Sequence, residues 1–251
     1  MEILTSIIKI GCFDTFIKYF PEAQDGAVVA IGLLCAILCM ASAYLLGSIN
    51  FAIVLSKLRG DDIRKHGSQN AGTTNMLRTY GKKAAVITLV GDFLKGTASA
   101  LIGMLLFGML GQYLASLFCV LGHVFPVYYK FRGGKGIATA AGTILACEPI
   151  IFLVLVAIFT VIVAFTKYVS LASIMVALLY PLILDRWYKI IQVPSGLHLL
   201  MVMIMAGVIV WKHYPNMKRL WNKTESKLSF KKKTEANEET KSEKKSLHDQ
   251  D

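Results

Sequence analysis

The sequence predicts an all-α integral membrane protein, a polytopic bundle of about seven transmembrane helices whose motif-bearing loops lie in the cytoplasm. Hydrophobic residues make up 55% of the 251 positions and charged residues only 17%, and the mean hydropathy is +0.56. A soluble domain with this composition would have too little polar surface to cover itself. No alternating strand pattern is evident, and a bilayer excludes an open sheet that faces lipid.

A helix needs about 20 apolar residues to cross a bilayer. The apolar runs then predict spans near residues 27–55, 84–109, 111–130, 137–147, 149–167, 169–188 and 196–212. The run at 137–147 is short, so its full crossing stays open. These spans belong to one transmembrane domain over residues 27–228.

Two terminal segments flank this domain. Residues 1–26 combine apolar positions with Lys9, Asp14 and Lys18, which is typical of an amphipathic helix on the membrane surface rather than a cleavable signal. Residues 229–251 mix Lys and Glu with almost no apolar residues, so we expect a charged, disordered cytoplasmic tail.

The distribution of Lys and Arg predicts the orientation. Basic residues crowd the segment 56–83, the turn 129–136, position 167 and the chain from Lys212 onward, whereas the opposite face has only Lys9, Lys18, Arg186 and Lys189. Basic loops stay in the cytoplasm. The N-terminus is therefore predicted outside and the C-terminus inside, and the net charge of +11 needs no nucleic-acid partner.

Few side chains within the spans suggest chemistry. Four of the five cysteines lie inside apolar runs and none forms a CxxC pair, so we expect neither a disulfide nor a metal site. Asp92 and Lys95 share a helix face, which favours a structural ion pair, although such residues can also line an internal cavity.

The segment Gly67-Ser-Gln-Asn-Ala-Gly-Thr-Thr-Asn-Met-Leu-Arg78 is suited to bind an anion. Its glycines allow the backbone to curl, so that N–H groups converge, and the guanidinium of Arg78 matches a phosphate group. Two further polar motifs are predicted on the same side of the membrane, Phe131-Arg-Gly-Gly-Lys-Gly136 and His213 with Asn216. A tight polar turn without a ligand is the alternative interpretation of the first segment. The candidate phosphate-binding residues of all three motifs are Gly67, Ser68, Asn70, Gly72, Thr74, Asn75, Arg78, Gly133, Gly134, Lys135, Gly136, His213 and Asn216.

Other signatures are excluded by the residues that follow each motif. Gly67 and Gly72 have Walker A spacing, but Thr73 and Thr74 stand where Gly-Lys is required. No histidine is followed by an acid in an HxxxxD pattern, and no Ser or Cys has an evident neighbouring base. A nucleotide site of the Walker type and a covalent acyl-enzyme are therefore not expected.

The motifs in their order resemble one family, the bacterial acyl-phosphate:glycerol-3-phosphate acyltransferases of the PlsY type. The similarity covers about residues 45–227. It rests on Gly47-Ser-Ile-Asn-Phe51, Asp62 to Arg78, Asp92-Phe-Leu-Lys-Gly96, Gly122-His-Val-Phe-Pro126, Phe131 to Thr139, His213-x-x-Asn216-x-x-Arg219-Leu220 and Thr224-Glu225-x-Lys227. The chain departs from the family pattern, which has Pro at Asn50, Gly at Gln69, Ala at Thr73 and Gly at Lys223. The change at Gln69 puts a β-carbon into the phosphate loop.

The resemblance implies an enzyme that transfers a fatty acyl group from acyl phosphate to the sn-1 hydroxyl of glycerol 3-phosphate, giving lysophosphatidate and phosphate. By the same resemblance, the catalytic residues are Ser68, Arg78, Lys135, His213 and Asn216. The partners are then the two substrates and membrane lipids, with no cofactor, metal, nucleic acid or obligate protein partner expected. A transporter of a phosphorylated metabolite would also need basic helix ends and remains the alternative.

Overall fold

The computed structural model describes residues 25–192 and 196–228, and all regular secondary structure within these ranges is helical. Of the predicted N-terminal segment 1–26, residues 1–24 lie outside the described residues, and so does the whole predicted tail 229–251. The last two residues of the N-terminal segment already belong to the first described helix. The elements are α3 (Asp25–Ser48), α4 (Phe51–Lys57), η1 (Ile63–Lys65), α5 (Thr73–Tyr80), α6 (Lys82–Val124), η2 (Val127–Tyr129), α7 (Ile137–Cys147), α8 (Pro149–Thr166), α9 (Val169–Ile190), α10 (Gly196–Lys212) and α11 (Tyr214–Trp221).

The first predicted span, 27–55, is divided into two helices. Helix α3 ends at Ser48, and α4 begins at Phe51 after Asn50 has adopted an extended backbone. The Asn50 side chain accepts a hydrogen bond from the N–H of Ile53 at 3.1 Å, as a helix N-cap does. Its amide also donates to the carbonyl of Ala71 at 3.2 Å, so the break ties α4 to the glycine-rich segment.

Helix α6 is a helical hairpin rather than one straight rod. The backbone leaves helical geometry at Phe107 and Gly108, where Gly108 has a φ of 57°. The two arms then pack closely, because a β-carbon on Gly103 would collide with the carbonyl of Gly111. This turn separates the predicted spans 84–109 and 111–130 and lies within three residues of the predicted boundary.

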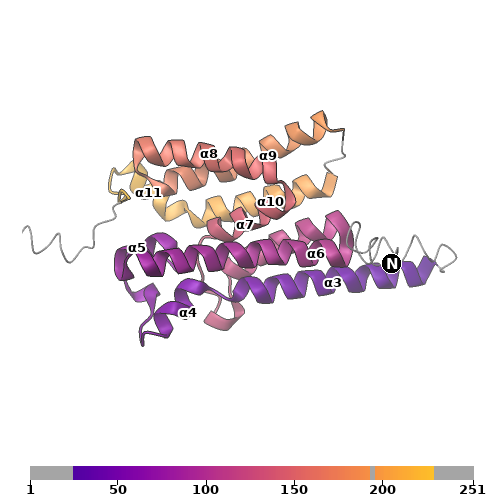
Figure 1. The fold of residues 1–251 in the computed structure, drawn as a ribbon, viewed down its shortest axis with the longest axis horizontal. Helices are drawn as coiled ribbons and strands as arrows, with labels where there is room; N and C mark the ends of the chain where they lie inside the picture. Colours follow the sequence, from indigo (N-terminus) through magenta and orange to yellow (C-terminus); the bar gives the residue numbers. More distant parts are fainter. Residues whose placement is uncertain (1–24, 193–195, 229–251) are drawn as a thin grey trace, which may run out of the picture.

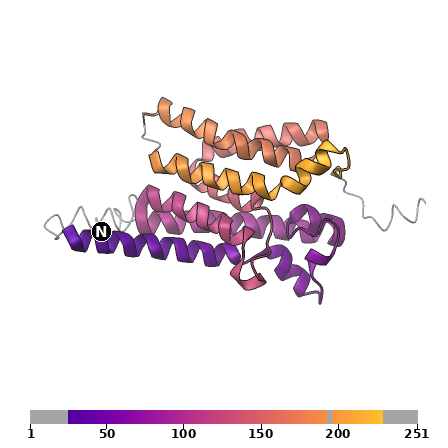
Figure 2. The same cartoon turned by 180° about the vertical axis from the view of Figure 1, so that it is seen from behind.

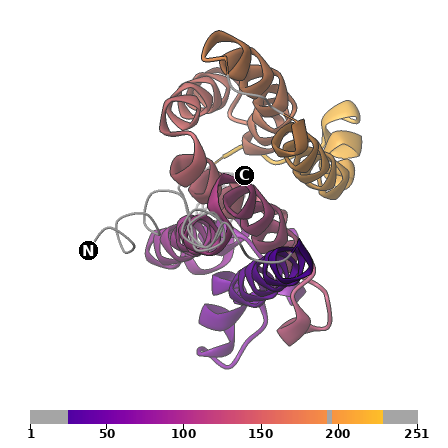
Figure 3. The ribbon, with the colours of Figure 1, turned by 90° about the vertical axis from the view of Figure 1, so that its right-hand side faces the viewer.

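The remaining helices complete a bundle around a buried apolar core. Helix α7 packs on the first arm of α6, where Thr97 Oγ1 donates to the carbonyl of Gly142 at 2.9 Å. Seen along the bundle, the salmon, orange and yellow helices α8–α11 form one group and the indigo and purple helices α3–α5 another, with the magenta part of the chain between them (Figure 3). The larger core cluster includes Tyr113, Leu117, Val120, Ile151, Leu155, Leu184, Tyr188, Val202 and Ile209.

Among the described residues, four helical segments are long and apolar enough to cross a membrane, namely 26–48, Lys82–Tyr129, Pro149–Thr166 and Val169–Ile190. Helices α10 and α11 make a fifth if they count as one span bent by 52°. Length and hydropathy thus give fewer spans than the seven predicted. The α6 hairpin is one continuous segment by this criterion, and α7, with 11 residues, is too short to qualify.

The polar motifs gather at one end of the bundle. Helices α4, α5 and α11 lie together at that end, whereas the described chain begins at the other (Figure 1). The view from behind shows the same arrangement (Figure 2). The fold therefore brings the first and last polar motifs to one end, although they are far apart in sequence.

Candidate functional site

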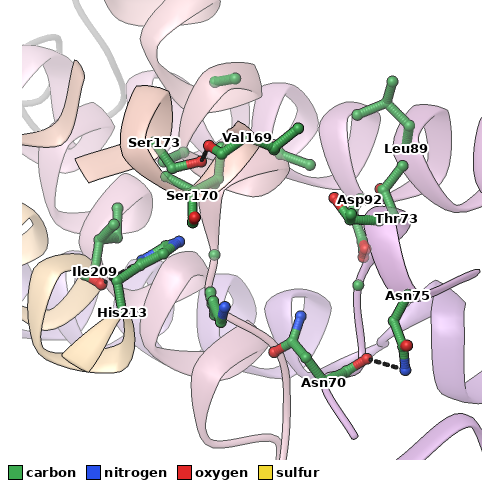
Figure 4. Close-up of a pocket in the computed structure, with 18 of the residues that line it drawn as sticks. Asn70, Thr73, Asn75, Leu89, Asp92, Val169, Ser170, Ser173, Ile209 and His213 are labelled. Carbon is green, nitrogen blue, oxygen red and sulfur yellow. Dashed lines mark hydrogen bonds between the residues drawn. The ribbon is translucent and has the colours of Figure 1, made fainter. Parts of the chain in front are cut away.

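A cavity of about 1470 Å³ extends from the polar end into the bundle. Its polar end is lined by residues of the segment 66–79, by Lys135, and by residues of α11 and the chain that follows it. Its other walls come from α6, α7, α8, α9 and α10 and are mostly apolar, with Asp92 and His123 on α6 and two serines on α9 as the exceptions. Figure 4 shows Asn70, Thr73 and Asp92 on one side of this cavity, facing Ser170 and His213 on the other.

The side chain of Asn75 holds the glycine-rich segment in place through hydrogen bonds to its backbone. Its side chain is buried, and the two hydrogens of its Nδ2 are shared among the carbonyl oxygens of Ile63, His66 and Asn70, which lie 3.2, 3.0 and 3.1 Å away. Its oxygen accepts the N–H of Ser68 at 2.9 Å. The cavity wall includes Asn75, but these bonds occupy its amide, so its visible role is to hold the loop in place.

The loop needs left-handed backbone at two positions. Gly67 has a φ of 56° and Gln69 a φ of 59°. Helix α5 then begins at Thr73, with Gly72 as its N-cap. The first N–H groups of a helix have no carbonyl partner within it and attract anions. Gly67, Ser68, Asn70, Gly72 and Thr74 all line the cavity, as a phosphate-binding loop requires.

Lys135 reaches the cavity from the loop before α7. Its Nζ donates to the side-chain oxygen of Asn216 on α11. Burial lowers the pKa of Lys135 to about 8, and the nearby Arg219 and Arg78 act in the same direction, whereas Glu225 opposes them. The lysine is thus a largely buried cation whose charge depends on its neighbours.

Glu225 organises the residues opposite that lysine. Its Oε1 accepts hydrogen bonds from Asn216 Nδ2 at 2.6 Å and Ser170 Oγ at 2.7 Å, and its Oε2 accepts one from Arg219 Nε at 2.6 Å. Burial would raise the pKa of Glu225, but these hydrogen bonds, that from Ser170 first, hold the pKa below its ordinary value. A fixed carboxylate therefore orients Asn216.

Arg78 points into the same region from α5. Its Nη2 lies 3.4 Å from the carbonyl of Ser226, and the side chain is partly buried. Burial lowers the pKa of Arg78, while the negative charge of Glu225 raises it. An arginine remains charged at any ordinary pH, so Arg78 supplies a permanent positive charge beside Lys135.

His213 is held by its own helix end. Its Nδ1 lies 2.8 Å from the carbonyl of Ile209, and the residue is 3% exposed. Because a carbonyl only accepts, Nδ1 carries the hydrogen, and Nε2 of the neutral ring is left as an acceptor. The side chain lines the cavity near Ser170 (Figure 4).

Two of the predicted phosphate-binding glycines do not line the cavity. The N–H groups of Gly133 and Gly134 donate to the carbonyls of Val124 and His123, both at 3.2 Å. A β-carbon on either glycine would collide with His123. Their visible role is close packing on the end of α6, and only Lys135 and Gly136 of this motif reach the cavity.

The pair predicted inside the membrane forms a buried triad. Lys95 Nζ lies 2.7 Å from Asp92 Oδ1, 3.0 Å from His123 Nδ1 and 2.6 Å from the carbonyl of Ile49. Asp92 and His123 also line the cavity. Asp92 and Lys95 therefore form the predicted ion pair, and Asp92 also lines an internal cavity, as the other interpretation of the pair expected.

The structure brings together most of the predicted site residues: Ser68, Arg78, Lys135, His213 and Asn216 all line one cavity. Sequence reasoning missed Ser170 and the central position of Glu225. Ser170 lies at the start of an apolar helix and carried no motif signal, whereas Glu225 stood in the Thr224-Glu225 pair without an assigned role.

Comparison with known proteins identifies relatives of this chain. A family model described as glycerol-3-phosphate acyltransferase matches residues 37–223. Glycerol-3-phosphate acyltransferase 2 of Bacillus cereus (strain ZK / E33L) is 43% identical over 195 residues, which cover 76% of this chain and 94% of the relative. The glycerol-3-phosphate acyltransferase of Bacillus subtilis (strain 168) is 40% identical over 75% of this chain and 95% of the relative.

Solved structures agree with the sequence relatives. A crystal structure of PlsY, described as an integral membrane glycerol 3-phosphate acyltransferase in its glycerol 3-phosphate form, matches with a TM-score of 0.71 and 37% identity. It covers 77% of this chain and 96% of its own. The lysophosphatidic acid form of the same protein matches with a TM-score of 0.69 and 36% identity, over 78% of this chain and 96% of its own.

Proposed function

Because this chain belongs to the glycerol-3-phosphate acyltransferase family, we propose that it transfers a fatty acyl group from acyl phosphate to the sn-1 hydroxyl of glycerol 3-phosphate. The hydroxyl oxygen attacks the acyl carbonyl carbon, and the bond from that carbon to the phosphate oxygen breaks. The products are lysophosphatidate and inorganic phosphate. An acyl phosphate is a mixed anhydride, so its phosphate leaves readily.

The observation that carries this proposal is the two-sided character of the cavity. Its polar end collects Arg78, Lys135 and the N-terminus of α5, whereas its wall on α8 is apolar and its wall on α9 becomes apolar beyond Ser173. Both substrates have a phosphate group, and the donor also has a long hydrocarbon chain. One cavity can therefore hold the phosphates among cations and the chain among apolar side chains.

The wall between α6 and α8 provides a route for the acyl chain. Leu94 on α6 is 56% exposed and Val156 on α8 is 42% exposed, and both line the cavity. In a bilayer these side chains contact lipid. A lipid-soluble donor can therefore enter sideways, while glycerol 3-phosphate enters from water at the polar end.

Catalysis in this proposal rests on positioning and on charge. Arg78 and Lys135 neutralise the phosphates and stabilise the charge that develops on the leaving group. Ser170 donates its hydroxyl hydrogen to Glu225, and Ser173 donates its own to the carbonyl of Val169 at 2.8 Å, so neither is poised as a nucleophile. A phosphate oxygen of a substrate takes the proton of the acceptor hydroxyl, while His213 and Asn216 orient the substrates.

We further propose seven crossings of the cytoplasmic membrane, with the polar end of the cavity in the cytoplasm. In this proposal each arm of α6 crosses the membrane separately, and the short helix α7 crosses it as well. A cysteine placed at Ser68 or Lys218 should then be labelled only from inside the cell, and one at Gln192 only from outside. Labelling of Ser68→Cys from outside intact cells would overturn this orientation.

The test of the reaction uses protein purified in detergent with labelled glycerol 3-phosphate. Acyl phosphate should support formation of lysophosphatidate, whereas acyl-CoA and acyl carrier protein should be poor donors, because no nucleotide or carrier-binding motif is evident. Product formation without a sealed compartment also excludes a pure transporter. Equal rates with acyl-CoA, or a requirement for a divalent metal, would refute the proposed donor and mechanism.

A further inference from the structure

The apolar part of the cavity has a closed end, which we call the cavity floor and define by the residues Ile144, Phe152, Tyr180 and Met205. Each is the lining residue of its helix that lies farthest along the chain from the polar end. Ser170 and Tyr180 both line the cavity on α9, ten positions apart. At 1.5 Å per helical residue, the apolar part is about 15 Å deep.

Tyr180 and Met205 separate the cavity from a second space. The same two side chains line a narrow gap, too small to hold a water molecule, together with Tyr113, Ser116, Leu117, Met201 and Val202. Tyr180 and Met205 are each 3% exposed. The floor is therefore a thin partition of side chains with a narrow gap on its far side.

The region behind the partition is fixed by hydrogen bonds. The hydroxyl groups of Tyr113 and Tyr188 lie 2.9 and 2.7 Å from Oε1 of Glu148, and 2.8 Å from each other. These residues join α6, α9 and the start of α8. The far end of the bundle is thus held closed, and a chain in the cavity meets a firm stop.

We infer that Tyr180 and Met205 set the length of acyl chain that the enzyme prefers. This inference rests on the proposed function, because it takes the acyl chain to be the occupant of the apolar part. The donor reaches the cavity from lipid, whose tails are as apolar as the cavity wall, so its chain gains from packing contacts with the wall rather than from leaving water. Longer chains add such contacts until the terminal methyl group reaches Tyr180, and further methylenes have no room.

The lateral route proposed between α6 and α8 is the competing path for the chain. A chain that left the cavity between Leu94 and Val156 would extend into lipid and never contact Tyr180. The preferred chain length would then not depend on the residues of the cavity floor. Variants at the floor distinguish the two paths, because they change the depth of the cavity without changing its opening.

The experiment measures kcat/KM of the purified enzyme for acyl phosphates that lengthen by two methylene groups at a time. Tyr180→Ala joins the cavity to the gap behind it and should move the preferred length upward by at least one step. Ala177→Phe adds a ring one turn closer to the polar end and should move it downward, with a loss of about tenfold for the chain that the wild type prefers. Leu178→Ala, on the lipid-facing side of the same helix and 49% exposed, is the matched control and should keep the wild-type profile.

The outcomes separate the two proposals. Wild-type profiles in both Tyr180→Ala and Ala177→Phe would refute the floor, while the proposed reaction would stand. A wild-type enzyme that uses no acyl phosphate of any length would refute the reaction itself. Should Tyr180→Ala not fold, Met205→Ala removes the other half of the partition and is expected to shift the preference in the same direction.

Discussion

The ammonium group of Lys135 donates a hydrogen bond to the side-chain oxygen of Asn216, so the loop before α7 meets helix α11 inside the cavity. Asn216 in turn donates to Glu225 at 2.6 Å. The asparagine therefore has both of its polar atoms occupied, with a cation on one side and an anion on the other. The ammonium group of Lys135 has three hydrogens and uses one of them here, so a substrate phosphate can accept hydrogen bonds from the others.

Lys135→Ala should reduce kcat/KM by about a hundredfold or more, because loss of one charge-assisted donor in a partly dry site costs a few kcal/mol. Lys218→Ala is the matched control. It removes an exposed lysine from α11 at the same end of the molecule, and activity should stay within about twofold. Steady-state kinetics with purified variants give both values. Equal losses in the two variants would mean that only the overall positive charge matters.

The pKa of Lys135 predicts the alkaline side of the pH profile. Burial lowers this pKa to about 8, so the free enzyme loses the lysine charge as the pH rises through that value. If the ammonium form binds phosphate, kcat/KM falls above pH 8. In Lys135→Arg the cation persists, so the fall should move upward by more than a unit, even where the absolute rate is lower. An unchanged profile in that variant would assign the alkaline limb to another group.

Arg78 tests whether shape matters in addition to charge. Arg78→Ala should be nearly inactive, and Arg78→Lys should remain impaired by about tenfold or more, because an ammonium group cannot form the planar, two-pronged contact with phosphate. Arg59→Lys serves as the control, since Arg59 lies over the ring of Tyr80, away from the cavity wall. A rise in the KM for glycerol 3-phosphate would identify which substrate Arg78 holds. Full activity in Arg78→Lys would show that charge alone is sufficient.

Much of the helical framework follows from local sequence. The predicted spans 137–147 and 196–212 coincide with α7 and α10, and the predicted boundary near residue 110 lies beside the turn at Phe107 and Gly108. The break after Ser48 was missed because the apolar run continues through Phe51 to Leu55. Only the contacts of Asn50 with Ile53 and Ala71 reveal it.

Residues of the candidate site could be predicted where a charged side chain or a glycine-rich segment marks them in the sequence. They could not be predicted where a residue's role depends on tertiary contacts. Arg78 and Lys135 could be chosen because cations at one membrane face suit phosphate. The roles of Gly134 and Ser170 depend on neighbours that are distant in sequence. Position 134 requires glycine because His123 packs where a β-carbon would lie. Ser170 contributes because its hydroxyl group donates a hydrogen bond to the carboxylate of Glu225. No local pattern contains either contact.

Two departures from the family pattern coincide with backbone strain. Gln69 and Lys223 have φ of 59° and 57°, in the left-handed region that favours glycine, and the family pattern has glycine at both positions. A residue with a side chain costs about 1–2 kcal/mol there, from which the entropy that glycine adds to the unfolded chain subtracts about 0.4–1 kcal/mol. Both side chains are exposed, so neither gains packing that would offset this cost.

Gln69→Gly and Lys223→Gly should therefore each stabilise the protein by roughly 0.5 to 1 kcal/mol, which corresponds to a rise in Tm of about 1–4 °C for a chain of this size. Thermal unfolding of the purified protein in detergent measures this shift, and the double variant tests whether the two sites act independently. Lys218→Gly, inside α11, is the control with the opposite sign, because glycine weakens a helix by about 1 kcal/mol. A lower Tm in Gln69→Gly would mean that the glutamine side chain supports the loop through contacts of its own.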